Sequence, residues 1–344
     1  MEGLCKEKSS VFISRRETPW DNQIGRSPIE EFIRSNFIDD YNSHHEPLIT
    51  TNESELINSY IPDKCPHCGT YDIRKKGYTS DGIHRYYCQR CKKTFNILTN
   101  TIFHNHKLSI KEWIEFLRNL FQFLGVNADS WNNKNAFTTS RYWTQKVFIL
   151  LENYQSDIIL SNDVWLDETF YPLRSDQLKR NSTGDMMRGL SSNQMCIGTA
   201  ASKDTCICIY EGNGKPSQER TYNTFKDHIA KDAFIIHDED NSHGMLIHKL
   251  NLKHAAFNSL AIKMKEGKDN PMWRINDIHS LLKRFLNAHS SFNRENLQGF
   301  LDLFTFIMNP PDDKLEKIKI LLDLSFRTHK SLKYREFYGK TPQN

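Results

Sequence analysis

The spacing of apolar residues changes along this chain and separates a helical stretch from a stretch of strands and helices. Between residues 109 and 124 apolar side chains recur at helical spacing, and Ser109 and Glu112 form a capping box at the start. A polar stretch at 125–140 predicts a turn, and residues 141–154 predict a second amphipathic helix. Two helices around a polar turn favour a helix-turn-helix DNA-binding unit, and a small helical linker bundle is the alternative.

From residue 160 onward, short apolar runs bounded by polar residues predict strands that alternate with helices. The predicted strands are 163–173, 193–202, 205–213 and 233–240, and the predicted helices are 220–230, 274–289, 295–309 and a basic tail helix at 312–330. This order indicates an α/β layer with a mixed sheet. Cys206 and Cys208 alternate within one of these runs, so we interpret them as buried strand residues rather than metal ligands.

The distribution of charge separates an acidic segment from a basic segment in the N-terminal third of the chain. Residues 1–60 hold 11 acidic and 6 basic residues, whereas residues 61–111 hold 10 basic and 3 acidic ones. We read 1–60 as an acidic extension with a short helix starting at the capping box Ser27–Glu30 and a loop at 39–54. The basic segment suggests a polyanionic partner, and a solvated basic face is the plainer explanation.

The basic segment also contains two Cys-x-x-Cys pairs. Nineteen residues separate Cys68 of the pair Cys65/Cys68 from Cys88 of the pair Cys88/Cys91, a spacing typical of tetrahedral zinc. Two redox or disulfide pairs are the alternative. The N-terminus is polar and no apolar run approaches the roughly 18 residues of a membrane span, so we expect a reducing compartment, where thiols bind metal more readily.

Cations and aromatic residues fill the segment around the cysteines. Such a mixture suits phosphate contact and base stacking. The candidate DNA-binding residues are Arg74, Lys75, Lys76, Arg85, Tyr86, Lys92 and Lys93.

Two carboxylates follow predicted strands in the second half of the chain. Asp167 lies within the first strand and Asp238 ends the run Phe234–Ile236, so one sheet can hold both, and a cation between them would offset their repulsion. Oxygen ligands favour Mg²⁺ or Mn²⁺. Glu168 and Asp240 are the nearest rivals for these acidic positions.

The helix predicted at 274–289 offers further polar groups beside its buried stripe. At about 100° per residue, Asn276, His279 and Lys283 fall within roughly 60° of one another. Asp277 lies about 100° away from Asn276 and is the poorer partner. An ordinary Asn cap on a solvated helix edge is the alternative explanation.

The motifs from 61 to 310 resemble those of DDE-type insertion-sequence transposases, in the bacterial group with a zinc ribbon before a ribonuclease H-like domain. The resemblance is carried by the ribbon and the segment after it, by "VWLDETF", by "RGLSSNQMCIGTAAS" and by "NDIHSLLKRFL", in consistent order. It implies a zinc ribbon at 61–104, a helix-turn-helix-like segment at 105–156 and a ribonuclease H-like catalytic domain at 157–310. The acidic N-terminal extension at 1–60 and the helical basic tail at 311–344 find no clear counterpart in that group.

The resemblance further implies a metal-dependent phosphoryl transfer on DNA. Asp167 matches the first acid of the group and Asp238 the second, Asn276 stands where many such enzymes have Glu, and Lys283 matches a Lys seven residues later. The implied cofactors are structural Zn²⁺ and catalytic Mg²⁺ or Mn²⁺. His279 would orient the nucleophile or contact DNA, with a structural role left equally open.

The implied partner is double-stranded DNA, as terminal inverted repeats and target, bound by a homodimer or larger assembly without a membrane. The implied location is the cytoplasm at the nucleoid, or the nucleus in a eukaryotic host. A zinc-ribbon DNA-binding regulator and an inactive or domesticated transposase copy are the alternatives.

Overall fold

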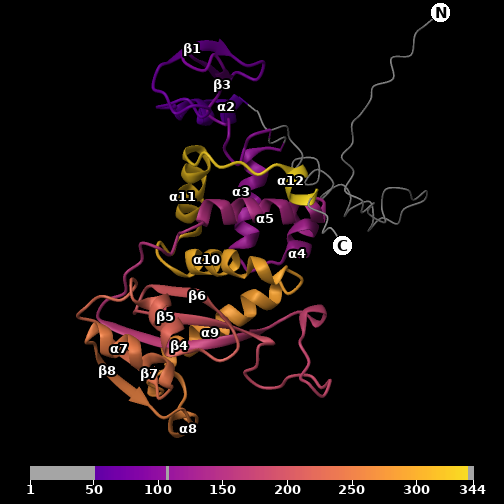
Figure 1. Cartoon of the computed structure of the whole chain (residues 1–344). Helices are drawn as coiled ribbons and strands as arrows, with labels where there is room; N and C mark the ends of the chain where they lie inside the picture. The colour runs from indigo at the N-terminus through magenta and orange to yellow at the C-terminus, as the bar shows by residue number, and fades with distance from the viewer. Residues whose placement is uncertain (1–50, 106–107, 340–344) are drawn as a thin grey trace, which may run out of the picture. The chain divides into compact units, whose positions relative to one another are not determined.

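The computed structural model describes residues 51–105 and 108–339, which form two compact units (Figure 1). One unit comprises the described residues up to Trp143 together with those from Ser331 onward, and the other comprises Thr144–Lys330. The expected helix at Ser27–Glu30 lies outside the described residues. No helix among the described residues is long and apolar enough to cross a membrane.

The first unit begins with a short helix and a small antiparallel sheet. Its early elements are α2 (Thr51–Ser59), β1 (Ile73–Tyr78), β2 (His84–Cys88) and β3 (Thr94–Phe95), with the strands in the order β1-β2-β3. The predicted loop at 39–54 is therefore wrong for residues 51–54, which open α2. Glu53 on α2 accepts hydrogen bonds from the backbone N–H groups of Ile110 and Lys111, so it caps a helix that follows the sheet.

Helices make up the rest of the first unit. They are α3 (Ile110–Leu120), α4 (Val126–Asn132), the start of α5 (Phe137–Leu151) and α12 (Tyr334–Tyr338). The predicted capping box is confirmed at its N-cap, where the Ser109 side chain accepts from the N–H of Glu112. The polar stretch predicted as a turn instead contains α4, which Gly125 precedes in extended conformation. Trp113, Phe116 and Trp143 pack edge to face or tilted in the core of these helices, with ring centroids 5.3–5.4 Å apart.

The second unit is a mixed α/β layer. Within the described residues its sheet has five strands in the order β6-β5-β4-β7-β8, where β4, β5 and β6 are antiparallel neighbours and β7 and β8 run parallel to β4. Their bounds are β4 (Asp163–Pro172), β5 (Gln194–Ala201), β6 (Cys206–Asn213), β7 (Phe234–Asp238) and β8 (Lys253–Phe257). The mixed sheet predicted from the sequence is confirmed, and Cys206 and Cys208 are buried in β6.

The helices of this unit include several that the sequence predicted and two that it did not. They are α6 (Gln218–Phe225), α7 (Gly244–Leu250), α8 (Ser259–Ile262), α9 (Trp273–Ala288), α10 (Leu297–Met308) and α11 (Lys314–Arg327), with short 3₁₀ turns η1 (Ser175–Gln177), η2 (Asn241–His243), η3 (Gly267–Asp269) and η4 (Arg294–Asn296). The two helices that were not expected are α7 and α8, and the strand β8 was not expected either.

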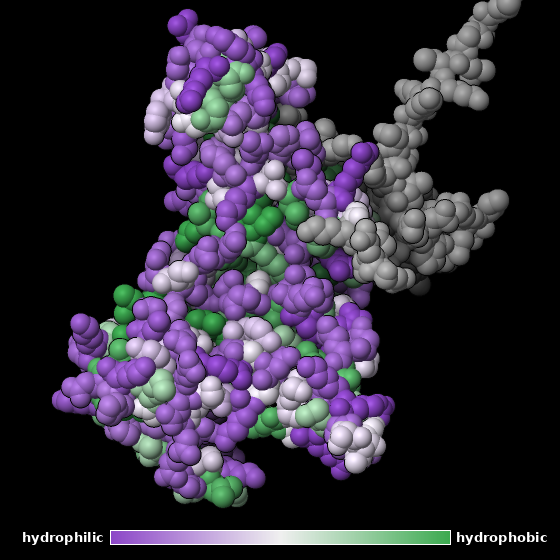
Figure 2. Space-filling model, viewed as in Figure 1, coloured by the Kyte–Doolittle hydropathy of each residue, from purple (hydrophilic) through white to green (hydrophobic). Residues whose placement is uncertain are grey.

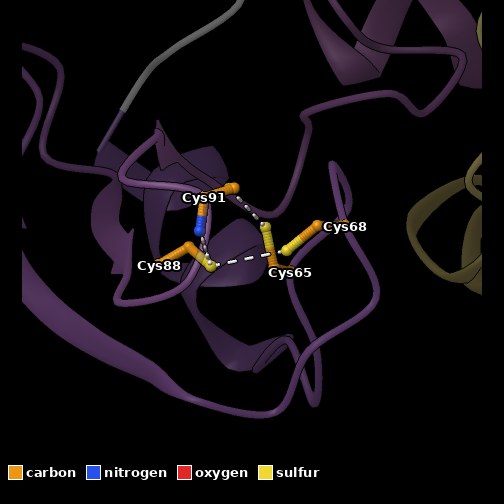
Figure 3. A group of neighbouring side chains, drawn as sticks. All are labelled: Cys65, Cys68, Cys88 and Cys91. Atoms are coloured by element: carbon orange, nitrogen blue, oxygen red, sulfur yellow. Dashed lines mark hydrogen bonds between the residues drawn. The ribbon is translucent and has the colours of Figure 1, made fainter.

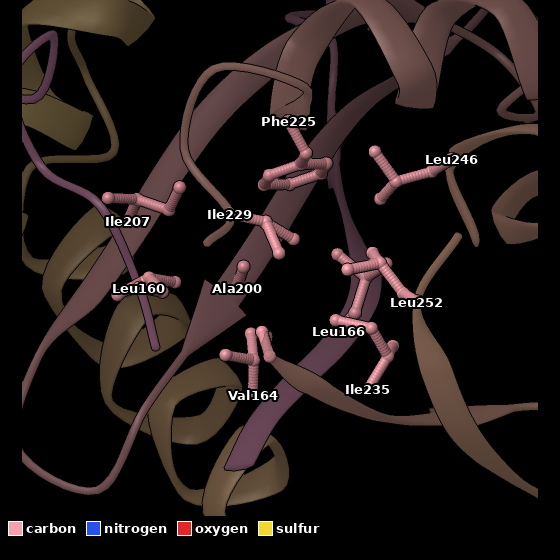
Figure 4. Packing of buried hydrophobic residues seen from close by; sticks show 11 residues of the cluster. Leu160, Val164, Leu166, Ala200, Ile207, Phe225, Ile229, Ile235, Leu246 and Leu252 are labelled. Atoms are coloured by element: carbon pink, nitrogen blue, oxygen red, sulfur yellow. The ribbon is translucent and has the colours of Figure 1, made fainter. Parts of the chain in front are cut away.

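Side chains of β4 point alternately to the two faces of the sheet, as a strand requires. Val164 and Leu166 join a buried cluster that includes Phe225 of α6 and Leu246 of α7 (Figure 4). On the other face, the Trp165 indole donates to the carbonyl of Pro271 and the Tyr171 hydroxyl to that of Leu286. Residues of β4 with odd numbers therefore face α9, and residues with even numbers face α6 and α7.

Candidate functional site

Four cysteine thiols converge in the first unit, at the base of the β1–β2 hairpin (Figure 3). The sulfurs of Cys65 and Cys91 lie 3.7 Å apart, and those of Cys68 and Cys88 lie 3.6 Å apart. Four sulfurs at the zinc–sulfur distance of about 2.3 Å in a tetrahedron would be about 3.8 Å from one another. The cysteines are free rather than disulfide-bonded, and their geometry could hold zinc.

Backbone conformation explains how each pair forms its turn. The N–H of Gly69 donates to the carbonyl of Cys65 at 2.8 Å, and the N–H of Lys92 donates to that of Cys88 at 3.0 Å. Both residues have positive φ, +73° and +60°, which a glycine adopts without strain. The turns also aim the backbone N–H groups of His67 and Cys91 at sulfur, each 3.4 Å away. Such bonds stabilise a thiolate.

The basic residues of the ribbon lie mostly at its surface. Arg74, Lys75 and Lys76 are exposed on β1, Lys92 and Lys93 are exposed after β2, and Arg85 is half-buried. Figure 2 shows the visible surface of this segment as largely hydrophilic.

Tyr86 does not lie on the surface. Its side chain is 3% exposed and stacks on Phe95 with ring centroids 5.7 Å apart, beside the cysteines. Its neighbour Tyr87 points the other way, pairs with Arg74 across the hairpin and lies under the ammonium of Lys76 at 4.8 Å. Of these two neighbours, Tyr87 is the one with an accessible ring.

In the second unit the structure brings Asp167 and Asp238 to neighbouring positions. Strands β4 and β7 run parallel with Leu166 beside His237, so the next residues on each strand are the two aspartates, on the face toward α9. Burial, and then the charge of Asp238, raise the pKa of Asp167 to about 7. Burial also raises the pKa of Asp238. Two carboxylates held this close repel one another, which is the environment that a cation would relieve.

Helix α9 covers this face and contributes the other predicted residues. His279 is buried with its Nδ1 3.9 Å from Asp167 Oδ2, and burial followed by the charge of Lys283 lowers its pKa to about 3. Asn276 and Lys283 are exposed on the same helix, one turn before and one turn after His279. Within the described residues, no hydrogen bond or ion pair joins Asn276 or Lys283 to either aspartate.

The rival acids are engaged elsewhere. Glu168 points to the opposite face of β4, where hydroxyls of Thr221 and Ser242 lie 3.3 and 3.2 Å from its Oε1. Asp240 caps the turn η2 by accepting from the N–H of Ser242. Because neighbouring residues of a strand point to opposite faces of the sheet, Asp167 and Glu168 cannot both face α9. Strand alternation was therefore the sequence signal that separates the two acids.

Two histidines near Asp238 were not predicted. His243 is fully buried, with Nε2 3.3 Å from Glu168 and Nδ1 3.8 Å from Asp238 Oδ1. Burial would lower its pKa, but the hydrogen bond and charge of Glu168 outweigh burial and raise it. His237 Nδ1 lies 3.1 Å from His243 Nδ1. His243 was missed because no sequence signal indicates the turn η2, which folds His243 back onto the strand. The role of His237 depends on that contact.

No known protein family and no curated protein matches this chain. Among solved structures, the chain is similar to one titled "Drosophila P element transposase strand transfer complex", with a TM-score of 0.26 and 13% sequence identity. The similarity covers 62% of this chain, which spans 59% of that one.

Proposed function

We propose that the protein is a DNA transposase of the DDE type, with a zinc ribbon followed by a ribonuclease H-like catalytic domain. The observation that carries the proposal is the pair Asp167 and Asp238, side by side on β4 and β7 under α9. The order of motifs along the chain, the mixed sheet with helices on both faces and the ribbon of four cysteines support it.

In this proposal Asp167, Asp238 and the Asn276 carbonyl oxygen hold divalent cations, Mg²⁺ or Mn²⁺. The donors fit, because two carboxylates with mutual repulsion and an amide oxygen are ligands that hard cations prefer. When bound, such ions activate a water or a 3′-hydroxyl and stabilise the leaving oxygen of a phosphodiester.

The remaining residues would position the reactants. The exposed ammonium of Lys283 would hold a DNA phosphate near the cleavage point. Buried His279 would keep the Asp167 carboxylate in place. Zn²⁺ would hold the ribbon through Cys65, Cys68, Cys88 and Cys91, and the hairpin surface with Arg74, Lys76, Arg85 and Tyr87 would grip terminal inverted repeats. Joining two DNA ends requires a dimer or larger assembly.

A DNA-cleavage assay tests this proposal. Its substrate is the DNA on either side of the gene, which would carry the two ends of the element. Wild-type protein should nick it in Mg²⁺ or Mn²⁺, and Asp167→Asn should lower the rate by at least about 100-fold while DNA binding in a mobility-shift assay is retained. Asp163→Asn is the matched control, because Asp163 is exposed at the start of the same strand.

Two results would count against the proposal. Wild-type protein that binds the ends but never cuts in either metal would favour a DNA-binding regulator. Cutting by Asp167→Asn at the wild-type rate would remove the aspartate pair from the chemistry.

A further inference from the structure

Three side chains meet where β7 ends and η2 begins. His237 Nδ1 and His243 Nδ1 lie 3.1 Å apart, and Asp238 Oδ1 lies 3.8 Å from His243 Nδ1. One nitrogen or oxygen from each of the three residues falls within 4.8 Å of the others. Two nitrogens and one oxygen bound to a single ion at about 2.1 Å in a tetrahedron would lie about 3.4 Å from one another. The observed separations bracket that value.

The second nitrogen of each histidine has a partner of its own. His243 Nε2 faces Glu168 Oε1 at 3.3 Å, and His237 Nε2 lies 3.1 Å from His254 Nδ1. Histidines that bind a metal usually present their other ring nitrogen to a carboxylate or another acceptor, which fixes the tautomer and the ring orientation. Both Nδ1 atoms are thereby turned toward the same point.

A chain of hydrogen bonds through the rings is the competing explanation. It requires a proton on one of the two Nδ1 atoms, whereas metal binding requires that neither carries one. The hydrogen-bond chain gives no role to Asp238, which lies beyond hydrogen-bonding distance of His243 at 3.8 Å. Metal binding uses all three groups.

An approach from solvent exists. His237 lines an open cavity of about 610 Å³ together with Asp240, His248 and exposed His254. An ion could therefore reach His237 from solvent without unfolding of the sheet.

We propose that His237, His243 and Asp238 form a binding site for a divalent transition-metal ion, with Glu168 holding His243 from behind. Two imidazole nitrogens select an ion such as Zn²⁺, Ni²⁺ or Co²⁺ over Mg²⁺, which prefers oxygen. The site is separate from the four cysteines. It shares Asp238 with the proposed catalytic pair but uses neither Asp167 nor Asn276, so its binding of metal can be measured without DNA cleavage.

Cobalt titration of full-length protein with its ribbon already saturated with Zn²⁺ tests the site. The titration is made in a large excess of Mg²⁺, which competes for sites built from oxygen ligands alone. One further equivalent of Co²⁺ should then bind, with the weak visible bands of nitrogen and oxygen ligands and without thiolate charge-transfer bands. His237→Gln and His243→Gln should each weaken binding by at least about 10-fold.

Matched variants separate this site from the proposed catalytic pair. His248→Gln lies on the same cavity but is not a ligand, and Asp167→Asn removes the other aspartate. Both should bind Co²⁺ as wild type does, even where Asp167→Asn no longer cuts DNA. If His243→Gln fails to fold by circular dichroism, His237→Gln carries the comparison.

Three results would overturn the inference. One is that wild-type protein with a zinc-loaded ribbon takes up no further Co²⁺. The second is that His237→Gln binds it as tightly as wild type, and the third is that Asp167→Asn loses it.

Discussion

His279 Nδ1 lies 3.9 Å from Asp167 Oδ2, across the contact between α9 and β4. The imidazole is buried, and its lowered pKa keeps it neutral at physiological pH. At this distance the ring contacts the carboxylate without a direct hydrogen bond, and as a neutral group it adds no charge to the site. Helix α9 therefore packs a neutral polar ring against Asp167 as well as covering it.

Removal of this polar ring should impair cutting. His279→Phe keeps the buried volume but places an apolar edge beside Asp167, so we expect cutting to fall by about 10- to 100-fold, as for lost support of a ligand. His279→Gln keeps a polar group there and should recover part of the rate. His289→Phe, also buried on the C-terminal side of α9, is the control. Equal cutting by His279→Phe and wild type would leave His279 a purely structural role.

Substitution of Lys283 tests contact with DNA without disturbing the fold, because the Lys283 side chain is exposed on α9. Lys283→Ala should weaken DNA binding and reduce the slope of log affinity against log salt by about 1, as for the loss of one phosphate contact. Arg284→Ala changes the next exposed residue, about 100° around the helix, and should leave the slope unchanged. An unchanged slope in Lys283→Ala would argue against phosphate contact.

The four cysteines predict a local dependence on zinc. Cys91→Ser should lose the bound zinc measured by atomic absorption, and limited proteolysis should then cut within 61–104, because a structural zinc contributes most of the folding energy of so small a sheet. The unit Thr144–Lys330 has its own core and should stay resistant. Cys196→Ser, buried in β5 outside the cluster, should keep the zinc. Persistent protection of the ribbon without metal would contradict this expectation.

Gly198 on β5 is required by close packing rather than by a turn. A Cβ built there would lie 2.3 Å from Glu211 Oε1 and 2.9 Å from the ring of Phe225. Gly198→Ala should therefore destabilise the second unit by about 1–3 kcal/mol, measured by chemical denaturation. Gly244→Ala is the control, since its nearest neighbour would be Gln218 at 3.6 Å. A loss below about 0.5 kcal/mol in Gly198→Ala would show that Glu211 moves aside freely.

The sequence predicted the sheet strands with long apolar runs and the helices with wide apolar stripes, because these features survive tertiary packing. It missed β8, whose exposed side chains leave no alternation to detect, and α7, which is only seven residues long. His243 was missed with them, since nothing in the sequence near it indicates that η2 returns the chain to β7.

Strand alternation explains two further outcomes. Tyr86 lies two residues before Cys88 on β2, so both point into the ribbon, as the burial pattern of the strand shows. Asp167 and Glu168 likewise divide between the faces of β4. The approach of His279 to Asp167 required the packing of α9 on the sheet, which sequence spacing alone does not fix.

Asp129 should make the stability of the first unit depend on pH. Its Oδ1 accepts from Asn119 at 3.0 Å and Asn133 at 2.7 Å, and burial raises its pKa from 3.8 to about 6, against the opposing hydrogen bonds from Ser140 and Asn119. The folded state therefore holds a proton that the unfolded chain releases near pH 4. Stability from this group is complete below about pH 4 and is lost as pH rises to about 6.

Asp129→Asn removes the titrating proton and keeps an acceptor for both amides. The free energy of unfolding of the variant, relative to wild type, should therefore rise between pH 4 and pH 7 by up to about 3 kcal/mol. Chemical denaturation at several pH values, followed by circular dichroism, measures the difference. A difference that stays constant across this range would mean that Asp129 is already ionised in the folded protein at pH 4, with its hydrogen bonds outweighing its burial.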